Sequence, residues 1–256
     1  MTALTLNLTK AQQSLTLCLQ KKGISTPPSV DMEVSMDVSG SFEDEHVSGI
    51  TTALMSRLVP WGLTFDPDKK LDVLTFSDGA NHVADVGPIT ADNYQGFVAN
   101  KIINKVPGWC HGTNYSYVIE QALRVFGWLN DQSPKTGFFG KLFGKLFGKL
   151  FGKKNQETEQ AKRPAVSIII TDGDNSDKAR TEKVLQESQD RGDKVYFIFL
   201  GISNNPTEFE FIDSLADRFP NVGIVKIKDL NAFLKLSDDE LNEKLITDEF
   251  VTWLKN

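Results

Sequence analysis

Three polar clusters of the sequence contain the residue types that bind hard metal ions. The first cluster comprises Asp37, Ser39 and Ser41. Its carboxylate and two hydroxyls stand at alternate positions and can converge if the glycine between the serines lets the loop curl. The second cluster is Gly112-Thr113-Asn114-Tyr115, and the third is Thr171-Asp172-Gly173-Asp174. Together they supply only oxygen ligands, which suits a hard cation such as Mg²⁺.

The elements around these clusters would bring them to one edge of a sheet. Residues 30–38 alternate as a strand does, and residues 47–58 carry apolar side chains at helical spacing. Residues 165–171 and 194–200 are short, nearly continuous apolar runs, which are typical of strands buried on both faces of a parallel sheet. Ligand groups of such sheets gather beyond the carboxyl ends of the strands, near the topological switch point. The first and third clusters follow predicted strands, and the second precedes a helix predicted over 118–129.

The rest of the pattern completes the predicted fold class. Residues 70–76 predict a further strand, and residues 81–86 its hairpin return. Residues 209–219 predict a helix, residues 222–227 a last strand, and residues 238–254 a closing helix. This order predicts an α/β protein with a doubly wound, mostly parallel sheet, one antiparallel edge strand and helices on both faces.

The N-terminal residues lie outside this pattern. Leucines alternate with polar residues over 4–8 and again over 15–19, and a period of two suits strands. Residues 1–28 are therefore predicted to form a β-rich extension to a domain that spans residues 29–256. A length of 256 residues with 40% hydrophobic content allows one sizeable core.

A basic insertion interrupts the domain at residues 133–163. Residues 139–154 are three copies of Phe-Gly-Lys-Leu followed by Phe-Gly-Lys-Lys. Residues 135–163 hold eight basic and two acidic residues, which leaves 20 basic and 32 acidic residues elsewhere. As a helix the repeat would form a basic amphipathic surface for an anionic membrane or an acidic groove. Its glycines, each costing ~1 kcal/mol in a helix, favour instead a tandem expansion in a tolerant surface loop.

Composition narrows the classes of partner and compartment. A formal charge of −6 and a pI near 5.2 argue against nucleic acid as the partner. Cys18 and Cys110 form no C-x-x-C pair, which indicates neither a disulfide framework nor a cysteine zinc site. No secretion signal and no apolar run of ~18 residues is present, so we expect a cytoplasmic protein. The oligomeric state is not indicated.

The three clusters together resemble a known binding site. Asp-x-Ser-x-Ser at 37–41, Gly-Thr-Asn-Tyr at 112–115 and Thr-Asp-Gly at 171–173 are similar to the metal-ion-dependent adhesion site (MIDAS) of von Willebrand A (vWA) domains. Each piece is weak evidence alone, but all three in order on this strand pattern are strong. Residues 6–23, 209–212 and 238–254 extend the resemblance to the TerF-like vWA proteins of the bacterial tellurite-resistance (Ter) family, over nearly the whole chain.

The resemblance implies a Rossmann-like vWA fold and a role for each residue of the clusters. Ser39, Ser41 and Thr113 would give hydroxyl ligands, and Asp37 and Asp172 would coordinate directly or through water. The expected metal is Mg²⁺, with Mn²⁺ and Ca²⁺ as alternatives. One position would remain for an acidic side chain of a protein partner, with other Ter-system proteins as candidates. The implied function is a non-catalytic, metal-dependent protein-binding module in tellurite or stress resistance.

The sequence departs from the family pattern at three places. His111 stands where a glycine often precedes Gly112, and Phe42 follows Ser41 where methionine is common. These two changes should spare the metal. The Phe-Gly-Lys-Leu insertion is not expected in relatives, and it leaves open whether the partner is the same or whether the protein acts at a membrane surface through residues 139–154.

Alternative interpretations of the clusters weigh less. Asp37 could be the nucleophile of a haloacid-dehalogenase-like phosphatase, with residues 172–177 as its acidic metal loop. Such an enzyme needs a general acid two residues after the nucleophile, and Ser39 cannot serve as one at neutral pH. The aspartates and serines could also be ordinary helix caps and turn residues. The three histidines, at 46, 82 and 111, are too scattered to predict a zinc trio.

Overall fold

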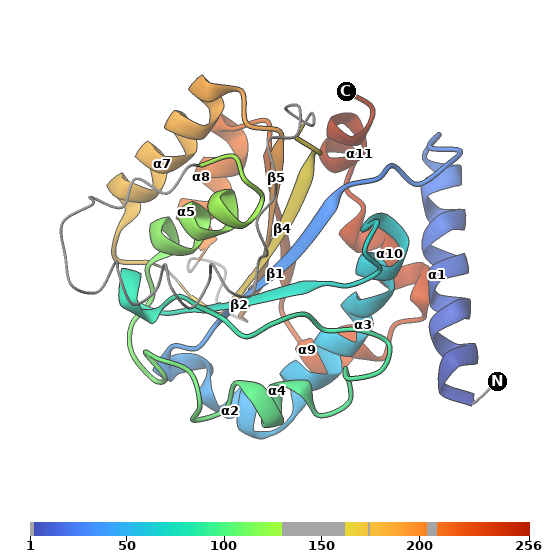
Figure 1. Cartoon of the computed structure of the whole chain (residues 1–256), viewed down its shortest axis with the longest axis horizontal. Helices are drawn as coiled ribbons and strands as arrows, with labels where there is room; N and C mark the ends of the chain where they lie inside the picture. Colours follow the sequence, from blue (N-terminus) through green and yellow to red (C-terminus); the bar gives the residue numbers. More distant parts are fainter. Residues whose placement is uncertain (1–2, 130–161, 174, 204–208) are drawn as a thin grey trace, which may run out of the picture.

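The computed structural model describes residues 3–129, 162–173, 175–203 and 209–256 (Figure 1). The insertion predicted at 133–163 lies outside the described residues except for its last two, Lys162 and Arg163. The predictions about the repeat at 139–154, including membrane contact, therefore stay predictions.

A six-stranded sheet forms the centre of the molecule (Figure 1). The strands, in sequence, are β1 (Asp31–Asp37), β2 (Asp72–Phe76), β3 (Ala84–Asp85), β4 (Ala165–Thr171), β5 (Val195–Ile202) and β6 (Val222–Ile227). Their order across the sheet is β3-β2-β1-β4-β5-β6. All neighbouring pairs are parallel except β2 and the short edge strand β3. The predicted doubly wound sheet with one antiparallel edge strand is confirmed.

Helices cover both faces of the sheet (Figure 1). One face carries α1 (Ala3–Lys21), α3 (Ile50–Phe65), α4 (Phe97–Lys101), α9 (Leu230–Leu234), α10 (Asp238–Leu245) and α11 (Asp248–Leu254). The other face carries α5 (Tyr115–Val125), α7 (Lys178–Arg191) and α8 (Glu210–Arg218). A short helix, α2 (Glu43–Val47), precedes α3, and Gly49 between them has a φ of +81°, which favours glycine.

Side chains that alternate along the strands divide the core in two. On β5, Tyr196 and Ile198 pack with the α3 side, whereas Phe197 and Phe199 pack with the α5 side. Strands buried on both faces are nearly continuous apolar runs for this reason. β1 is different, because its face toward α5 carries Glu33, Ser35 and Asp37, all fully buried. This polar row leads along β1 to the end of the strand at Asp37.

The topological switch point lies between β1 and β4. The chain leaves β1 to cross one face of the sheet through α3, and it reaches β4 after crossing the other face through α5. The two strands are nevertheless hydrogen-bonded neighbours, with Met36 opposite Ile170. The connections therefore diverge beyond the carboxyl ends of β1 and β4, where open α/β sheets place their ligands.

The predicted β-rich N-terminal extension is wrong, because residues 3–21 form the helix α1. Leucines two residues apart also place pairs four residues apart on one helix face, and Leu15 and Leu19 form such a pair. Both side chains are fully buried, and α1 packs against α3 and α10. Leu17, which the strand pattern grouped with them, points away and is 55% exposed. The alternation of leucines fits both the period of a strand and the period of a helix. The segment is a helix because its leucine face packs against two other helices.

The predicted closing helix over 238–254 is two helices, α10 and α11. Thr247 caps the second helix, because its side chain accepts a hydrogen bond from the N–H of Phe250. The first helix begins with a capping box between Ser237 and Glu240. Within the described parts of the chain, no helix combines the length and the apolar character needed to cross a bilayer.

Candidate metal centre

Asp37 lies at the base of the site, at the carboxyl end of β1. Its side chain is fully buried, and Oδ1 accepts a hydrogen bond from the N–H of Ser39 at 2.8 Å. Oδ2 accepts from the hydroxyls of Thr171, at 2.8 Å, and Thr113, at 3.3 Å. Burial raises the pKa of Asp37 to about 7, and the nearby charge of Asp172 adds to the increase. In the part of the chain that the structure describes, no Lys or Arg forms an ion pair with Asp37.

The loop after β1 curls so that its two serine hydroxyls meet. Residues Gly40–Phe42 form a short 3-10 turn, and the Oγ atoms of Ser39 and Ser41 are 3.3 Å apart. Gly40 permits the close approach of a second segment, because a Cβ there would lie 3.2 Å from the backbone oxygen of Cys110. Gly40 does not have a positive φ, so the structure supports a packing role for this glycine and not the conformational role that the sequence predicted.

Asp172 enters the same group from β4. The hydroxyl of Ser41 donates to its Oδ1 at 3.1 Å. The strand pairing of β1 with β4 brings the two aspartates together, because both residues stand at the carboxyl ends of adjacent parallel strands. The first and third clusters thus converge as expected.

Thr113 completes the group from the segment before α5. Two backbone hydrogen bonds hold this segment: the N–H of Asn114 donates to the oxygen of Ser77 at 3.1 Å, and the N–H of Ser176 donates to the oxygen of Thr113 at 3.0 Å. The carboxylate of Asp177 accepts from the N–H groups of Tyr115 and Ser116, both at 3.1 Å, and so fixes the start of α5. All five predicted residues are therefore brought together.

The donor set fits a hard divalent cation. It contains two carboxylates and three hydroxyls, with no nitrogen or sulfur, which is the ligand class that Mg²⁺, Mn²⁺ and Ca²⁺ prefer. Two carboxylates placed together, one of them fully buried, also repel each other when both are ionised. A cation between them would remove both the repulsion and the cost of burying the charge.

The group opens into a cleft of about 910 Å³. Exposure increases from the buried Asp37 to the exposed Ser41. Ser41, Thr113 and Asp172 line the cleft together with Lys228 and Asp229, which follow β6, and Asn231 of α9. A macromolecular partner can therefore reach three of the five residues.

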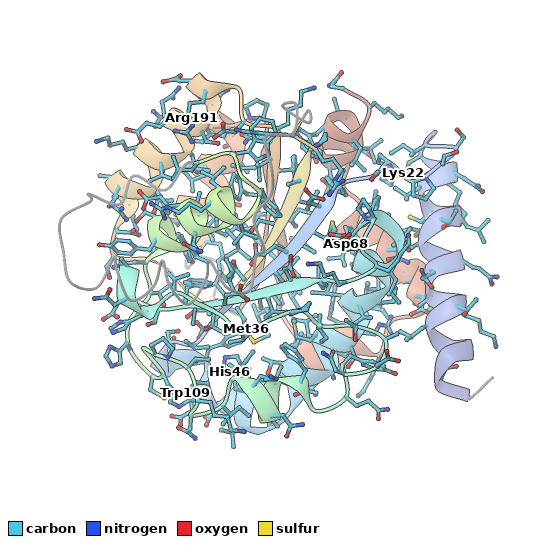
Figure 2. All side chains as sticks on the ribbon, viewed as in Figure 1. Lys22, Met36, His46, Asp68, Trp109 and Arg191 are labelled. Carbon is cyan, nitrogen blue, oxygen red and sulfur yellow. The ribbon has the colours of Figure 1, made fainter. Side chains whose placement is uncertain are left out.

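Three residues position the site in roles that were not predicted from the sequence. Thr171 donates to Asp37, and its place directly before Asp172 could have indicated it. Asp177 holds the start of α5, as described above. His46 is fully buried beside Trp109, with ring centroids 5.4 Å apart (Figure 2), and its Nε2 bonds the backbone oxygen of Asp37 at 2.8 Å. Nothing in the sequence around this single histidine indicated its bond to the backbone of Asp37.

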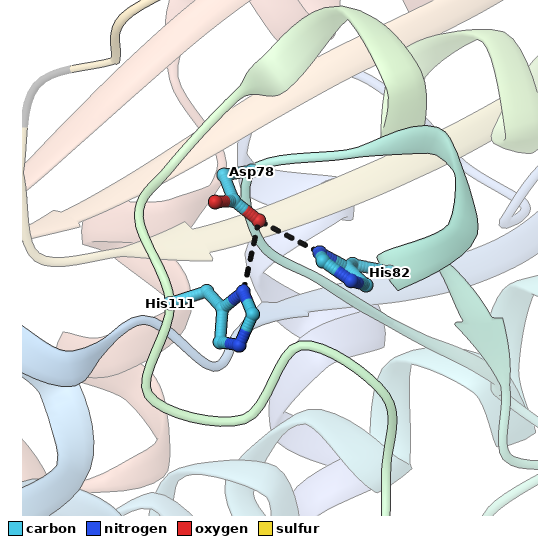
Figure 3. Close-up of side chains that lie close together, drawn as sticks. All are labelled: Asp78, His82 and His111. Atoms are coloured by element: carbon cyan, nitrogen blue, oxygen red, sulfur yellow. Dashed lines mark hydrogen bonds and ion pairs between the residues drawn. The ribbon is translucent and has the colours of Figure 1, made fainter.

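The two departures from the family pattern have separate places in the structure. Phe42 is fully buried and packs edge-on against His46, with ring centroids 4.9 Å apart. His111 is exposed and joins His82 and Asp78 in a second cluster (Figure 3). The sequence predicted no zinc trio of histidines; in the structure, an aspartate and the fold bring two of the three histidines together, and His46 is not part of this cluster.

Comparisons with known proteins agree with this fold. A solved structure of proximal thread matrix protein 1 from the mussel byssus is similar, with a TM-score of 0.52, 15% identity, and coverage of 86% of this chain and 47% of that one. A second structure of that protein, with a zinc-occupied MIDAS motif, gives a TM-score of 0.50, 15% identity, and coverage of 86% and 48%. The chain thus spans about half the length of these structures. The fold is that of a vWA domain.

A family model matches the C-terminal part of the chain. Residues 150–256 match the vWA-TerF-like model, described as the vWA domain found in the TerF C terminus. The resemblance to TerF-like vWA proteins is thereby confirmed over that part of the chain. No curated protein sequence matches the chain.

Proposed function

We propose that this chain is a non-catalytic module that binds a protein partner through a divalent metal, Mg²⁺ in the first place. The observation that carries the proposal is the convergence of one buried and one accessible carboxylate with three hydroxyls at the topological switch point. The residues that would hold the metal are Asp37, Ser39, Ser41, Thr113 and Asp172.

The residues of the cleft would have different roles in such a site. Asp37 supplies buried negative charge, and its hydrogen bonds with Thr113 and Thr171 hold the carboxylate in one orientation. Ser41 and Asp172 face the cleft, where an incompletely filled metal shell supplies a strong positive charge to an incoming ligand. An acidic side chain of the partner is the ligand that suits this position, and Lys228 on the cleft wall adds attraction for it.

The same geometry disfavours the phosphatase alternative. A nucleophilic aspartate must present a free carboxylate oxygen to the substrate. Both oxygens of Asp37 accept hydrogen bonds, and the side chain is 0% exposed. Ser39, two residues later, bonds through its backbone N–H and has no acidic group. We infer that the site binds and does not hydrolyse.

Metal binding is tested by calorimetric titration of chelator-treated protein with Mg²⁺, Mn²⁺ and Ca²⁺. We expect one site, with affinity reduced about tenfold or more in Ser41→Ala and Thr113→Ala. Ser48→Ala is the matched control, because Ser48 is an exposed serine whose hydroxyl, among the described residues, bonds only the backbone oxygen of Glu45. Absence of binding to the wild type would overturn the proposal, as would hydrolysis of a phosphomonoester that disappears in Asp37→Asn.

The cellular role that we infer is tellurite or stress resistance, acting in the cytoplasm with another Ter-system protein as partner. It rests on the match of residues 150–256 to the TerF-like vWA model. Growth on tellurite should depend on the gene in its bacterial host, and a copy carrying Ser41→Ala should fail to restore growth where Ser48→Ala succeeds. If both copies restored growth equally, tellurite resistance would not depend on the metal site.

A further inference from the structure

A second cluster of ligand-type side chains lies at the end of β2 (Figure 3). The first cluster, which we call the oxygen cluster, comprises Asp37, Ser39, Ser41, Thr113 and Asp172. Asp78 follows β2, His82 ends the 3-10 turn Ala80–His82, and His111 lies in the segment that leads to Thr113. The Nδ1 atoms of both histidines face one carboxylate oxygen of Asp78, at 2.7 Å for His82 and 3.4 Å for His111. One ligand atom from each residue lies within 4.8 Å of the others.

Backbone packing holds the two halves of this cluster together. Gly108, with a φ of +72°, lies so close to His82 that a Cβ at position 108 would be 2.5 Å from the Cβ of His82. The side-chain amide of Asn114 donates to the backbone oxygen of Asp78 at 2.6 Å. A Cβ at Gly112 would lie 3.5 Å from the Cβ of Asp78. The segment 108–114 is therefore packed and hydrogen-bonded against residues 78–82, so the backbone holds the three side chains close together.

The distances suit a four-coordinate transition-metal ion. Zn²⁺ binds imidazole nitrogen and carboxylate oxygen at about 2.0–2.2 Å, so neighbouring ligand atoms of a tetrahedral site lie about 3.3–3.5 Å apart. The separation of His111 Nδ1 from Asp78 Oδ1 already has this value. A bound ion would replace the hydrogen bond between His82 and Asp78 with one metal bond to each residue. The two side chains are partly exposed and can rotate to make these bonds. The side chains of Asp78, His82 and His111 are 43%, 30% and 51% exposed, so an ion can enter from solvent.

An ordinary surface ion pair explains less of this geometry. One histidine suffices to pair with one aspartate, whereas here two imidazoles, with ring centroids 4.7 Å apart, direct the same type of nitrogen at one oxygen. Neutral rings around an ionised carboxylate are the form that binds a transition metal.

We propose that Asp78, His82 and His111 form a second metal site, selective for a transition-metal ion of the Zn²⁺ type and separate from the oxygen cluster. The ligand types differ between the two sites: imidazole suits Zn²⁺, and an all-oxygen set suits Mg²⁺. Two histidines and one carboxylate leave a coordination position for water or for a side chain of a partner. The chain would therefore carry two neighbouring metals of different chemistry on one face.

The second site is mechanically connected to the first. The backbone oxygen of His111 accepts from the N–H of Gly40 at 2.9 Å, and Gly40 lies between the two serines of the oxygen cluster. Thr113, the third hydroxyl of that cluster, is two residues beyond His111 in the same segment. A metal that fixes His111 to Asp78 and His82 would therefore hold the segment that presents Thr113. The expected consequence is slower amide exchange over residues 108–114 when Zn²⁺ is bound.

Zinc titration followed at the histidine rings tests the proposal. In ¹⁵N-labelled protein with saturating Mg²⁺, added Zn²⁺ should shift the Nδ1 signals of His82 and His111 in a one-to-one complex. The buried His46 is an internal control, and its signals should stay unchanged. Zn²⁺ shifts at all three histidines, or at none, would overturn the proposal.

Calorimetry with variants separates the two sites. His82→Ala and His111→Ala should each weaken Zn²⁺ binding about tenfold or more, and the double variant should lose it. Ser41→Ala, which removes a ligand of the oxygen cluster, and Asp92→Asn, which removes an exposed aspartate elsewhere, should bind Zn²⁺ as the wild type does. Wild-type binding in the double histidine variant, or loss of binding in Ser41→Ala, would contradict the second site. Failure of Mg²⁺ binding alone would contradict only the first.

Discussion

The Nε2 atom of His46 lies 2.8 Å from the backbone oxygen of Asp37, and its Nδ1 atom lies 3.0 Å from the hydroxyl of Thr51. A carbonyl oxygen can only accept, so Nε2 carries the proton, and Nδ1 is then free to accept from Thr51. Burial lowers the pKa of His46, which favours this neutral form. The imidazole therefore connects the start of α3 to the strand end that presents the carboxylate of Asp37.

Removal of this connection should affect both stability and metal binding. His46→Ala leaves the buried oxygen of Asp37 without its donor and opens a cavity beside Phe42 and Trp109, so we expect a loss of about 2–4 kcal/mol in the free energy of unfolding. Mg²⁺ affinity should fall as well. His46→Gln can place an amide N–H near the position of Nε2 and should restore much of both. Urea unfolding with chelator and calorimetric titration measure the two effects, and equal values for Ala and Gln would exclude the hydrogen bond as the cause.

Two buried threonines give a matched test of a hydrogen bond to Asp37, the buried aspartate of the proposed metal site. The hydroxyl of Thr171 donates to Asp37, whereas the hydroxyl of Thr75 has no partner among the described residues. Thr171→Val should cost about 1–3 kcal/mol in metal-free protein, because it removes a donor from a buried carboxylate. Thr75→Val should be neutral or stabilising, because it removes an unsatisfied polar group of the same shape. Similar thermal midpoints for the two variants would show that the bond to Asp37 contributes nothing.

The oxygen cluster was predictable because each of its pieces follows or precedes a regular element. Asp37 and Asp172 end strands whose apolar patterns are clear, and parallel strands place such ends together. The cluster of Asp78, His82 and His111 was not predictable, because these residues come from irregular segments whose packing depends on a glycine with positive φ. The role of His46 was hidden for a related reason, since its partner is a backbone atom that belongs to no motif.

Local pattern also failed where tertiary packing decided the structure. The leucines of α1 fit both a strand and a helix, and burial distinguishes them: Leu15 is fully buried, whereas Leu17 is 55% exposed. Leu15→Ala should therefore cost about 2–5 kcal/mol, the range for a buried leucine, and Leu17→Ala should change stability by less than about 0.5 kcal/mol. Equilibrium urea unfolding of both variants measures the difference. A strand with both leucines on one face would give two similar losses.

Glu33 should make stability depend on pH. Its fully buried carboxyl lies on β1 between the hydroxyls of Ser35 and Ser167, both at 2.6 Å, and burial raises its pKa from 4.5 to about 8 despite these hydrogen bonds. A pKa raised on folding means that the folded state binds more protons between these two values, so the free energy of unfolding falls as the pH rises through that window. From pH 5 to pH 7.5 the contribution of Glu33 to this fall is about 3 kcal/mol.

Glu33→Gln removes this titration while it keeps the shape and the hydrogen-bonding capacity of a protonated carboxyl. We therefore expect the variant to lose about 3 kcal/mol less than the wild type between pH 5 and pH 7.5, measured by urea unfolding in chelator at both values. Glu249→Gln, at an exposed position, is the control and should follow the wild type. The carboxylates of the metal cluster titrate in all three proteins and cancel in the comparison. A parallel pH dependence of wild type and Glu33→Gln would mean that Glu33 is ionised in the folded protein, and that the serines alone compensate its burial.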